Sequence, residues 1–213
     1  MATIEGIYAI LPADRSLEDT LALAEAALRG GVRVIQLRDK RTGFARRKKK
    51  AQKLAKLVRA WEGVFIVNDS PQLALEAEAH GVHLGREDLR KSIAALRAEL
   101  PKGFIIGVSC GADAGFAAQA LREGADYLSF GAIFPSPTKP ERPPIGLARL
   151  AKARRMFPRA TIVAIGGITL EAIPAIRQAG ADAAAVISAL FAAEDVEAQA
   201  RRMVEAWRSA SLP

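Results

Sequence analysis

The sequence is poor in cysteine, histidine and aromatic residues. Of its 213 residues, one is a cysteine (Cys110), two are histidines and 6% are aromatic. A single thiol excludes an internal disulfide, and no Cys or His spacing typical of a zinc site is present. No uncharged apolar run approaches the ~18 residues of a membrane span, and the start MATIEGIYAI lacks the features of a secretory signal. We therefore expect a cytoplasmic protein with no membrane partner.

Acidic residues are absent from the segment 41–59, which carries nine basic ones. The whole formal excess of +8 lies in this segment, so a nucleic-acid partner has to be weighed. Apolar residues are interleaved at helical spacing, which predicts an amphipathic helix with a solvated basic face. We expect no nucleic-acid partner, and attraction of anionic substrates is a second role for this charge.

Eight short apolar runs recur along the chain, each followed by a longer helical pattern. They do not alternate between apolar and polar residues, as is typical of parallel strands buried on both faces. Eight such units without an inserted domain predict one α/β domain over residues 1–213, a single (β/α)8 TIM barrel. An open doubly wound sheet is the alternative. The runs are GIYAIL (6–11), RVIQLR (33–38), VFIVN (64–68), GVHLG (81–85), FIIGVS (104–109), YLSFGAI (127–133), TIVAIGG (161–167) and AAAVIS (183–188).

Glycine stands where several predicted helices end and the next strand begins. This residue accepts the left-handed backbone that closes a helix. The tripeptide GAD occurs at 124–126 and again at 180–182, each time as the entry to a strand. The expected helix-ending glycines are Gly30–Gly31, Gly81, Gly124 and Gly180.

Chemistry in such a barrel is expected at the carboxyl ends of the strands. The second strand ends in Gln36, Arg38 and Lys40, which alternation places on one face. Asp69 and Asp88 follow the third and fourth strands, so they should stand at neighbouring strand ends. Two such carboxylates suit Mg²⁺ if phosphate and water complete the octahedron. A surface turn at 36–40 and helix capping by either aspartate are the alternatives.

Phosphate binding is predicted on the other side of the mouth. The sixth strand runs into Phe134-Pro135-Ser136-Pro137-Thr138-Lys139-Pro140, a proline-rich loop with two hydroxyls and a cation. Gly166-Gly167 follows the seventh strand, and the eighth ends at Ile187-Ser188, where many barrels bind phosphate through backbone N–H groups. A purely structural loop at 134–140 is the alternative. Two separate anion sites favour an enzyme with two phosphorylated substrates.

At this level of detail the sequence resembles the thiamine-phosphate synthase family over essentially its full length. Order, spacing and strand position agree throughout. The matching segments are GVRVIQLRDK (31–40), FIVNDSPQLALEAEAHGVHLGREDL (65–89), IIGVS (105–109), GADYLSFGAIFPSPTK (124–139), IVAIGGIT (162–169) and GADAAAVISALF (180–191).

The resemblance implies that a thiazole phosphate attacks the methylene carbon of an aminopyrimidine diphosphate and displaces pyrophosphate. Arg38, Lys40 and Lys139 would be catalytic, and Asp69 and Asp88 would bind the Mg²⁺ cofactor. The pyrimidine diphosphate would be held by Gln36, Arg38, Lys40, Asn68, Ser109 and Lys139. The thiazole phosphate would be held by Ser136, Thr138, Gly167, Ile187 and Ser188.

The sequence departs from the family pattern at a few positions. Ser109-Cys110-Gly111 stands where the family commonly has Ser-x-His, Arg86 where it has Gln, and Ser136 where it has Thr. The missing histidine argues against the related thiazole tautomerases, in which it is thought to transfer a proton. A tautomerase-like paralogue and a non-catalytic phosphate-binding barrel are the alternatives. His80 and His83 are expected to be structural, and a homo-oligomer stays open.

Overall fold

Eight parallel strands close into a barrel in the computed structural model, which describes residues 3–135 and 143–211. Each strand pairs with its neighbour in the sequence, and β8 returns to pair with β1. The barrel prediction is confirmed, and the open sheet is excluded. The strands are β1 (Gly6–Ile10), β2 (Val34–Leu37), β3 (Val64–Asn68), β4 (Gly81–Leu84), β5 (Ile105–Gly111), β6 (Tyr127–Phe130), β7 (Thr161–Ile165) and β8 (Ala183–Val186).

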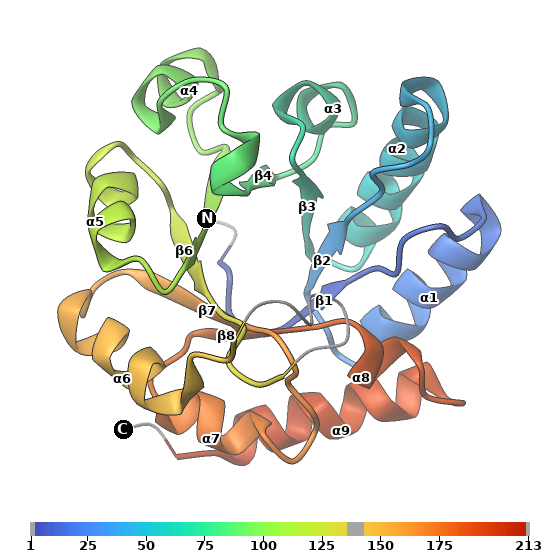
Figure 1. Ribbon diagram of the computed structural model, residues 1–213. Helices are drawn as coiled ribbons and strands as arrows, with labels where there is room; N and C mark the ends of the chain where they lie inside the picture. The colour runs from blue at the N-terminus through green and yellow to red at the C-terminus, as the bar shows by residue number, and fades with distance from the viewer. Residues whose placement is uncertain (1–2, 136–142, 212–213) are drawn as a thin grey trace.

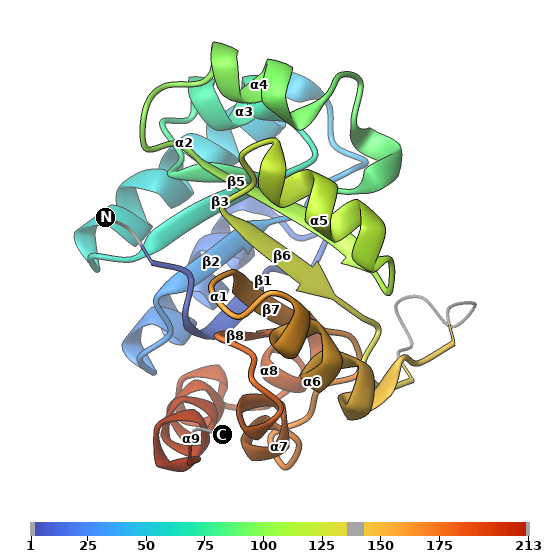
Figure 2. The same cartoon turned by 90° about the vertical axis from the view of Figure 1, so that its left-hand side faces the viewer.

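Helices surround the barrel on its outside, and α7, α8 and α9 gather on one side of it (Figures 1 and 2). The helix α9 packs against both α1 and α7. Throughout the described ranges, every helix is too short or too polar to span a bilayer. The helices are α1 (Leu17–Arg29), α2 (Phe44–Ala60), α3 (Pro71–Glu76), α4 (Ile93–Glu99), α5 (Ala114–Arg122), α6 (Gly146–Met156), α7 (Ile173–Gln178), α8 (Ser188–Phe191) and α9 (Val196–Ser209), with a 3₁₀ turn η1 at Arg86–Asp88.

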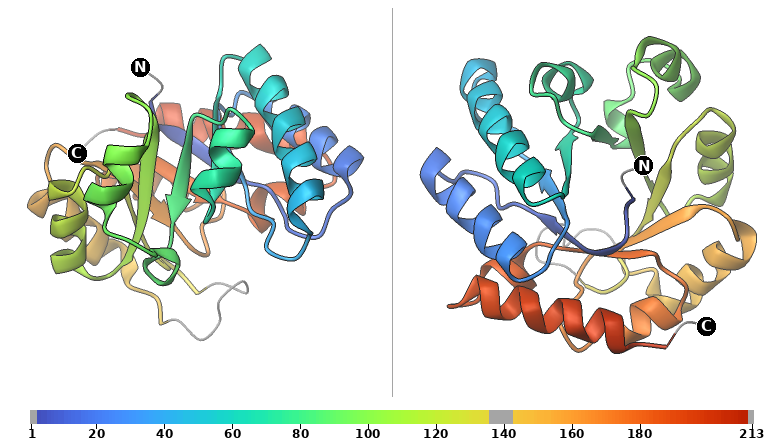
Figure 3. Two further views of the ribbon diagram at one scale, coloured as in Figure 1. Left: turned by 90° about the horizontal axis from the view of Figure 1, so that it is seen from above. Right: turned by 180° about the vertical axis from the view of Figure 1, so that it is seen from behind.

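Both faces of the strands are buried, which explains why their sequences do not alternate. In β1, Ile7 and Ala9 join the core between strands and helices, whereas Tyr8 and Ile10 join the core inside the barrel. Each fully buried aliphatic side chain contributes about 1.5–3 kcal/mol relative to an exposed one. The view from behind shows the strands at the centre with helices around them (Figure 3, right).

The glycine prediction holds at three helix ends and is wrong at Gly81. Gly31, Gly124 and Gly180 have φ values of 97°, 101° and 93°. Gly81 instead opens β4, where an added Cβ would lie 2.3 Å from the carbonyl oxygen of Ile105. After α3 the left-handed residue is Glu78, with φ 55°. Gly81 is therefore required by close strand packing rather than by a helix end.

The GAD repeat serves the amino end of the barrel. Asp126 and Asp182 each accept a hydrogen bond of 2.7 Å from a backbone N–H at the start of the neighbouring strand. The donors are Ile106 in β5 and Ile162 in β7. Arg97 and Arg154 pair with these two carboxylates. Each guanidinium also donates to the carbonyl of the glycine that opens its GAD tripeptide. Two equivalent clamps thus fix two helix-to-strand connections.

Candidate active site

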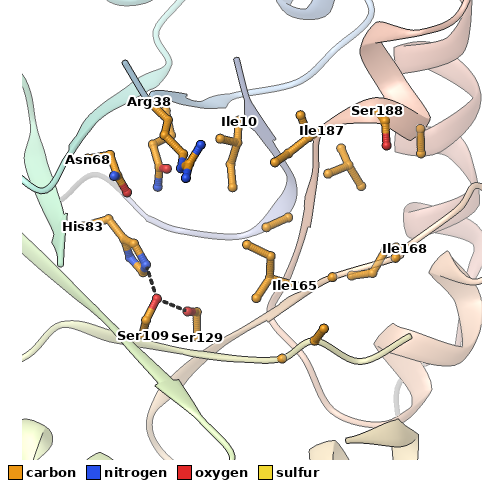
Figure 4. A pocket seen from close by; sticks show the side chains of 18 of the residues that line it. Ile10, Arg38, Asn68, His83, Ser109, Ser129, Ile165, Ile168, Ile187 and Ser188 are labelled. Carbon is orange, nitrogen blue, oxygen red and sulfur yellow. Dashed lines mark hydrogen bonds between the residues drawn. The ribbon is translucent and has the colours of Figure 1, made fainter. Parts of the chain in front are cut away.

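A cavity of about 490 Å³ opens at the carboxyl ends of the strands. Its size lies within the usual range for small-molecule sites. Seven residues predicted from the sequence line it, and they come from strands on both sides of the mouth (Figure 4). The seven are Gln36, Arg38, Asn68, Ser109, Gly167, Ile187 and Ser188. Ser136, Thr138 and Lys139 lie outside the described residues.

One wall of the cavity is polar and stands on a buried chain of hydrogen bonds. The Gln36 side chain donates to the Tyr8 hydroxyl over 2.8 Å, and that hydroxyl lies 2.8 Å from the hydroxyl of Tyr127. The chain continues to Nδ1 of His83 at 2.9 Å, and from Nε2 of His83 to the Ser109 hydroxyl at 2.9 Å. Two cavity residues that are distant in the sequence, Gln36 and Ser109, are therefore held by one network.

Burial sets the protonation of this chain. The two tyrosines are inaccessible to solvent, and desolvation raises the pKa of both hydroxyls well above the ordinary value. Gly107 makes room for the ring, since an added Cβ would lie 2.0 Å from Cζ of Tyr127. Both phenols therefore stay neutral at physiological pH, and their hydroxyls hold the side chains of Gln36 and His83 in place.

The two histidines differ in what they do. Nδ1 of His80 accepts a hydrogen bond of 3.0 Å from the backbone N–H of Phe65, as expected of a structural residue. His83 lies inside β4 and lines the cavity, where its ring links the Tyr127 hydroxyl to the Ser109 hydroxyl. No spacing in the sequence reveals this place, because it depends on the buried hydroxyls of Tyr127 and Ser109.

Charged side chains gather at the rim beside Arg38 and Asn68. The Lys40 ammonium lies 2.7 Å from Oδ2 of Asp69 and 3.9 Å from Oδ1 of Asp88. Partial burial, followed by the neighbouring carboxylate of Asp69, raises the pKa of Asp88. Lys40, Asp69 and Asp88 are outside the lining of the cavity itself, so they form a separate charged cluster at its edge.

Neither aspartate is a helix cap, which removes the alternative considered from the sequence. Ser70 caps α3 and Ser92 caps α4 through their hydroxyls. Asp69 has a φ of 64°, a left-handed backbone that costs roughly 1–3 kcal/mol for a residue other than glycine. Such strain at a strand end, with a carboxylate turned toward a second one, is typical of a functional residue.

The donor set of this cluster fits a hard divalent cation. Oδ2 of Asp69 is buried and makes no well-aligned hydrogen bond, although the Lys40 ammonium is close. Over the described ranges no group of three or more His, Cys, Asp or Glu side chains converges. Two carboxylates would leave most of an octahedral Mg²⁺ shell to water and phosphate oxygens. Asp69 and Asp88 are thus suited to a metal that arrives with a phosphorylated ligand.

The opposite wall is built from backbone and aliphatic side chains. Gly166 and Gly167 have φ values of 101° and 64°, and a Cβ on Gly167 would lie 2.3 Å from the carbonyl oxygen of Pro135. The short helix α8 starts at Ser188, and the first N–H groups of a helix have no partner within it. Ile10, Ile165, Ile168 and Ile187 cover the region between the two walls (Figure 4). This side can accept an anion through its backbone and an apolar ring beside it.

The basic segment forms the amphipathic helix that the sequence predicts, α2. Several of its cations have acidic partners on the surface, as in the pair of Lys48 with Glu76 at 2.8 Å. Lys50 is the exception to the solvated face, because its side chain is only 8% exposed. The excess charge is therefore spread over a helix face, with one member turned inward.

The model of the family described as thiamine monophosphate synthase matches residues 7–190. This chain belongs to that family. A thiamine-phosphate synthase of Halorhodospira halophila is 46% identical over 96% of this chain and 95% of its own length. One of Acidithiobacillus ferrooxidans is 47% identical, over 93% of this chain and 92% of the relative.

Solved structures agree with the membership in the thiamine monophosphate synthase family. A thiamine phosphate pyrophosphorylase from Pyrococcus furiosus superposes with a TM-score of 0.83 at 31% identity, over 96% of both chains. A 3-hexulose-6-phosphate synthase superposes with a TM-score of 0.67 at 20% identity, over 94% of this chain and 99% of the other. The second likeness shows the barrel fold alone.

Proposed function

We propose that the protein is a thiamine-phosphate synthase. It would join an aminopyrimidine that carries a diphosphooxymethyl group to a thiazole that carries a phosphooxyethyl group, giving thiamine phosphate and pyrophosphate. The observation that carries the proposal is one cavity with two unlike walls and a charged rim. The polar wall suits an aminopyrimidine, the rim suits its diphosphate, and the glycine-lined wall suits a monophosphate.

In the proposed reaction the thiazole nitrogen forms a bond to the methylene carbon of the pyrimidine, and the bond from that carbon to the diphosphate oxygen breaks. The electron pair leaves with the diphosphate, so negative charge grows on it. Arg38 and Lys40 lie where they would stabilise this charge more in the transition state than in the ground state. Lys139 is assigned the same task from the family resemblance alone.

Asp69 and Asp88 are the residues that would hold Mg²⁺. When bound there, the ion would neutralise part of the charge on the diphosphate. The Lys40 ammonium lies 2.7 Å from Oδ2 of Asp69, so the same rim would offer a cation to the diphosphate beside the metal ligands. No general base is needed, because the attacking nitrogen carries no proton that must be removed.

Gly111 lines the cavity at the position where the family commonly has the histidine of its Ser-x-His motif. The absence of an imidazole there leaves a tautomerase without the group expected to transfer its proton. Gly111 itself contributes no titratable side chain to the polar wall. The residue pattern therefore supports the synthase over the tautomerase.

The decisive experiment is incubation of the purified protein with both substrates and Mg²⁺. Thiamine phosphate and pyrophosphate should form together, in equal amounts, and neither should form when one substrate is omitted. Mass spectrometry of the organic product and an enzymatic pyrophosphate assay provide the measurement. Rearrangement of the thiazole alone would indicate a tautomerase, and binding of both ligands without turnover would indicate a non-catalytic barrel.

A further inference from the structure

Asp39 stands between the two cations proposed to bind diphosphate, yet it points away from them. Arg38 lines the cavity and Lys40 reaches the charged rim, whereas the Asp39 side chain is 2% exposed. Alternation along an extended segment turns the middle residue of three to the opposite side. The carboxylate therefore enters the layer between the strands and α2.

A buried ammonium meets Asp39 in that layer. Nζ of Lys50 lies 3.0 Å from Oδ2 of Asp39 and donates to the carbonyl oxygen of Arg15 over 2.9 Å. Oδ1 of Asp39 accepts from the backbone N–H of Thr42 at 3.0 Å, and Oδ2 accepts from its hydroxyl at 2.8 Å. Burial opposes ionisation of Asp39, but the hydrogen bonds from Lys50 and Thr42 outweigh it and lower its pKa.

Three segments of the barrel mouth meet at this ion pair. Arg15 belongs to the loop after β1, Asp39 and Thr42 to the loop after β2, and Lys50 to the second turn of α2. Thr42 closes the loop back on Asp39, so the backbone on both sides of Lys40 is fixed. The pair is thus placed to hold the loop that carries Arg38 and Lys40.

Stability alone does not account for charges at this position. A buried ion pair gains little over an apolar pair of the same volume, because desolvation of both charges offsets their attraction. Without Lys50 the Asp39 carboxylate would be a buried charge with no ion-pair partner, which is strongly unfavourable. The loop could relieve this cost only by moving Asp39 out of the layer, and such a movement would displace its neighbours Arg38 and Lys40.

We propose that Asp39 and Lys50 are positioning residues that hold the loop after β2 in the conformation in which Arg38 and Lys40 bind a diphosphate. The inference deepens the proposed function and rests on it. Neither residue touches the ligand. They act by fixing the backbone and by keeping the Asp39 carboxylate occupied.

Binding of inorganic pyrophosphate in the presence of Mg²⁺, measured by calorimetry, tests this without turnover. Lys50→Met should weaken pyrophosphate binding at least tenfold, while affinity for the thiazole phosphate changes less than twofold. The double variant Asp39→Asn with Lys50→Met should recover part of the loss, because no unpaired carboxylate is left. Lys49→Met, on the exposed face of the same helix, is the matched control and should bind as the unaltered protein does.

Thr42→Val keeps both charges and serves if Lys50→Met does not fold. Loss of the single hydroxyl bond to Asp39 should weaken pyrophosphate binding about twofold to fivefold, the range of a modest hydrogen bond. Unchanged binding in these variants, or an equal loss for the thiazole phosphate, would overturn the positioning role alone. An unaltered protein that does not bind pyrophosphate would overturn the proposed function, and this inference with it.

Discussion

At the amino end of the barrel, the carboxylates of Asp126 and Asp182 accept backbone N–H groups and pair with arginines that are themselves hydrogen-bonded to carbonyls. At the carboxyl end, Asp69 and Asp88 face each other and share one ammonium. The same residue type is thus fully satisfied at one end and crowded at the other. Charges with all their partners hold the fold, and charges short of partners are available to a ligand.

The largest expected effect comes from the crowded end. Asp69→Asn should lower turnover by about a hundredfold or more, because a metal-bound diphosphate loses a ligand and transition-state charge loses its stabilisation. Its thermal stability should stay the same or rise, since like-charge repulsion is relieved. Synthesis rates over a Mg²⁺ titration and thermal unfolding measure both. Asp126→Asn is the control, with the opposite result: lower stability and near-normal turnover of the folded protein.

The clamp at the amino end gives the second effect. Arg154 donates to the carbonyls of Gly180, Pro158 and Ala160 and pairs with Asp182. Arg154→Met should lower the free energy of unfolding by about 2–4 kcal/mol, as expected when a hydrogen-bonded network is broken. Urea denaturation measures it. A large drop in turnover with unchanged stability would contradict the division between the two ends.

The third effect concerns the backbone of a glycine at the carboxyl end, Gly167, compared with a glycine away from the cavity, Gly103. Gly167→Ala should raise the KM for the thiazole phosphate about tenfold, because a Cβ would meet the Pro135 carbonyl and a left-handed backbone costs roughly 1–3 kcal/mol. Gly103→Ala is the matched control, since Gly103 has a similar φ of 83° but open space around an added Cβ. It should cost stability without a change in KM. Steady-state kinetics with each substrate varied in turn separates the two.

The smallest effect is a pH dependence from His80. Its Nδ1 accepts the N–H of Phe65, and burial followed by the nearby charge of Arg59 lowers its pKa. A lowered pKa means that the unfolded chain takes up a proton first as the pH falls below about 6.5. Its contribution to stability is therefore present above that pH and is lost as the pH falls through the lower value. His80→Asn should reduce the loss of stability between pH 7 and pH 5, measured by urea unfolding; equal slopes would contradict it.

Most of the fold could be predicted from the sequence because parallel strands buried on both faces leave a simple pattern of apolar runs. The errors concern residues whose conformation or residue type is determined by a tertiary contact. Gly81 was expected at a helix end but is needed where β4 passes close to Ile105. Glu78 adopts the left-handed backbone that the pattern assigned to glycine. Local propensity says little about how closely two strands approach.

Site residues at strand ends could be predicted from the sequence. Residues whose role depends on burial in the folded protein could not. Asn68 and Ser109 line the cavity as expected, because a barrel brings its strand ends together. The role of His83 depends on a buried chain of hydroxyls that no spacing reveals. Lys50 was counted with a solvated basic face, yet its ammonium is paired with Asp39 in the interior. A charge run does not show which of its members turns inward.

The pairing of β8 with β1 has a consequence for folding during synthesis. Ile10 and Ser188 line the same cavity although almost the whole chain separates them. A growing polypeptide that has not yet emerged past the final strand has an exposed edge on β1 and half of one wall missing. Ligand recognition therefore requires that β8 has been translated, and a product truncated before residue 183 would lack both closure and the site.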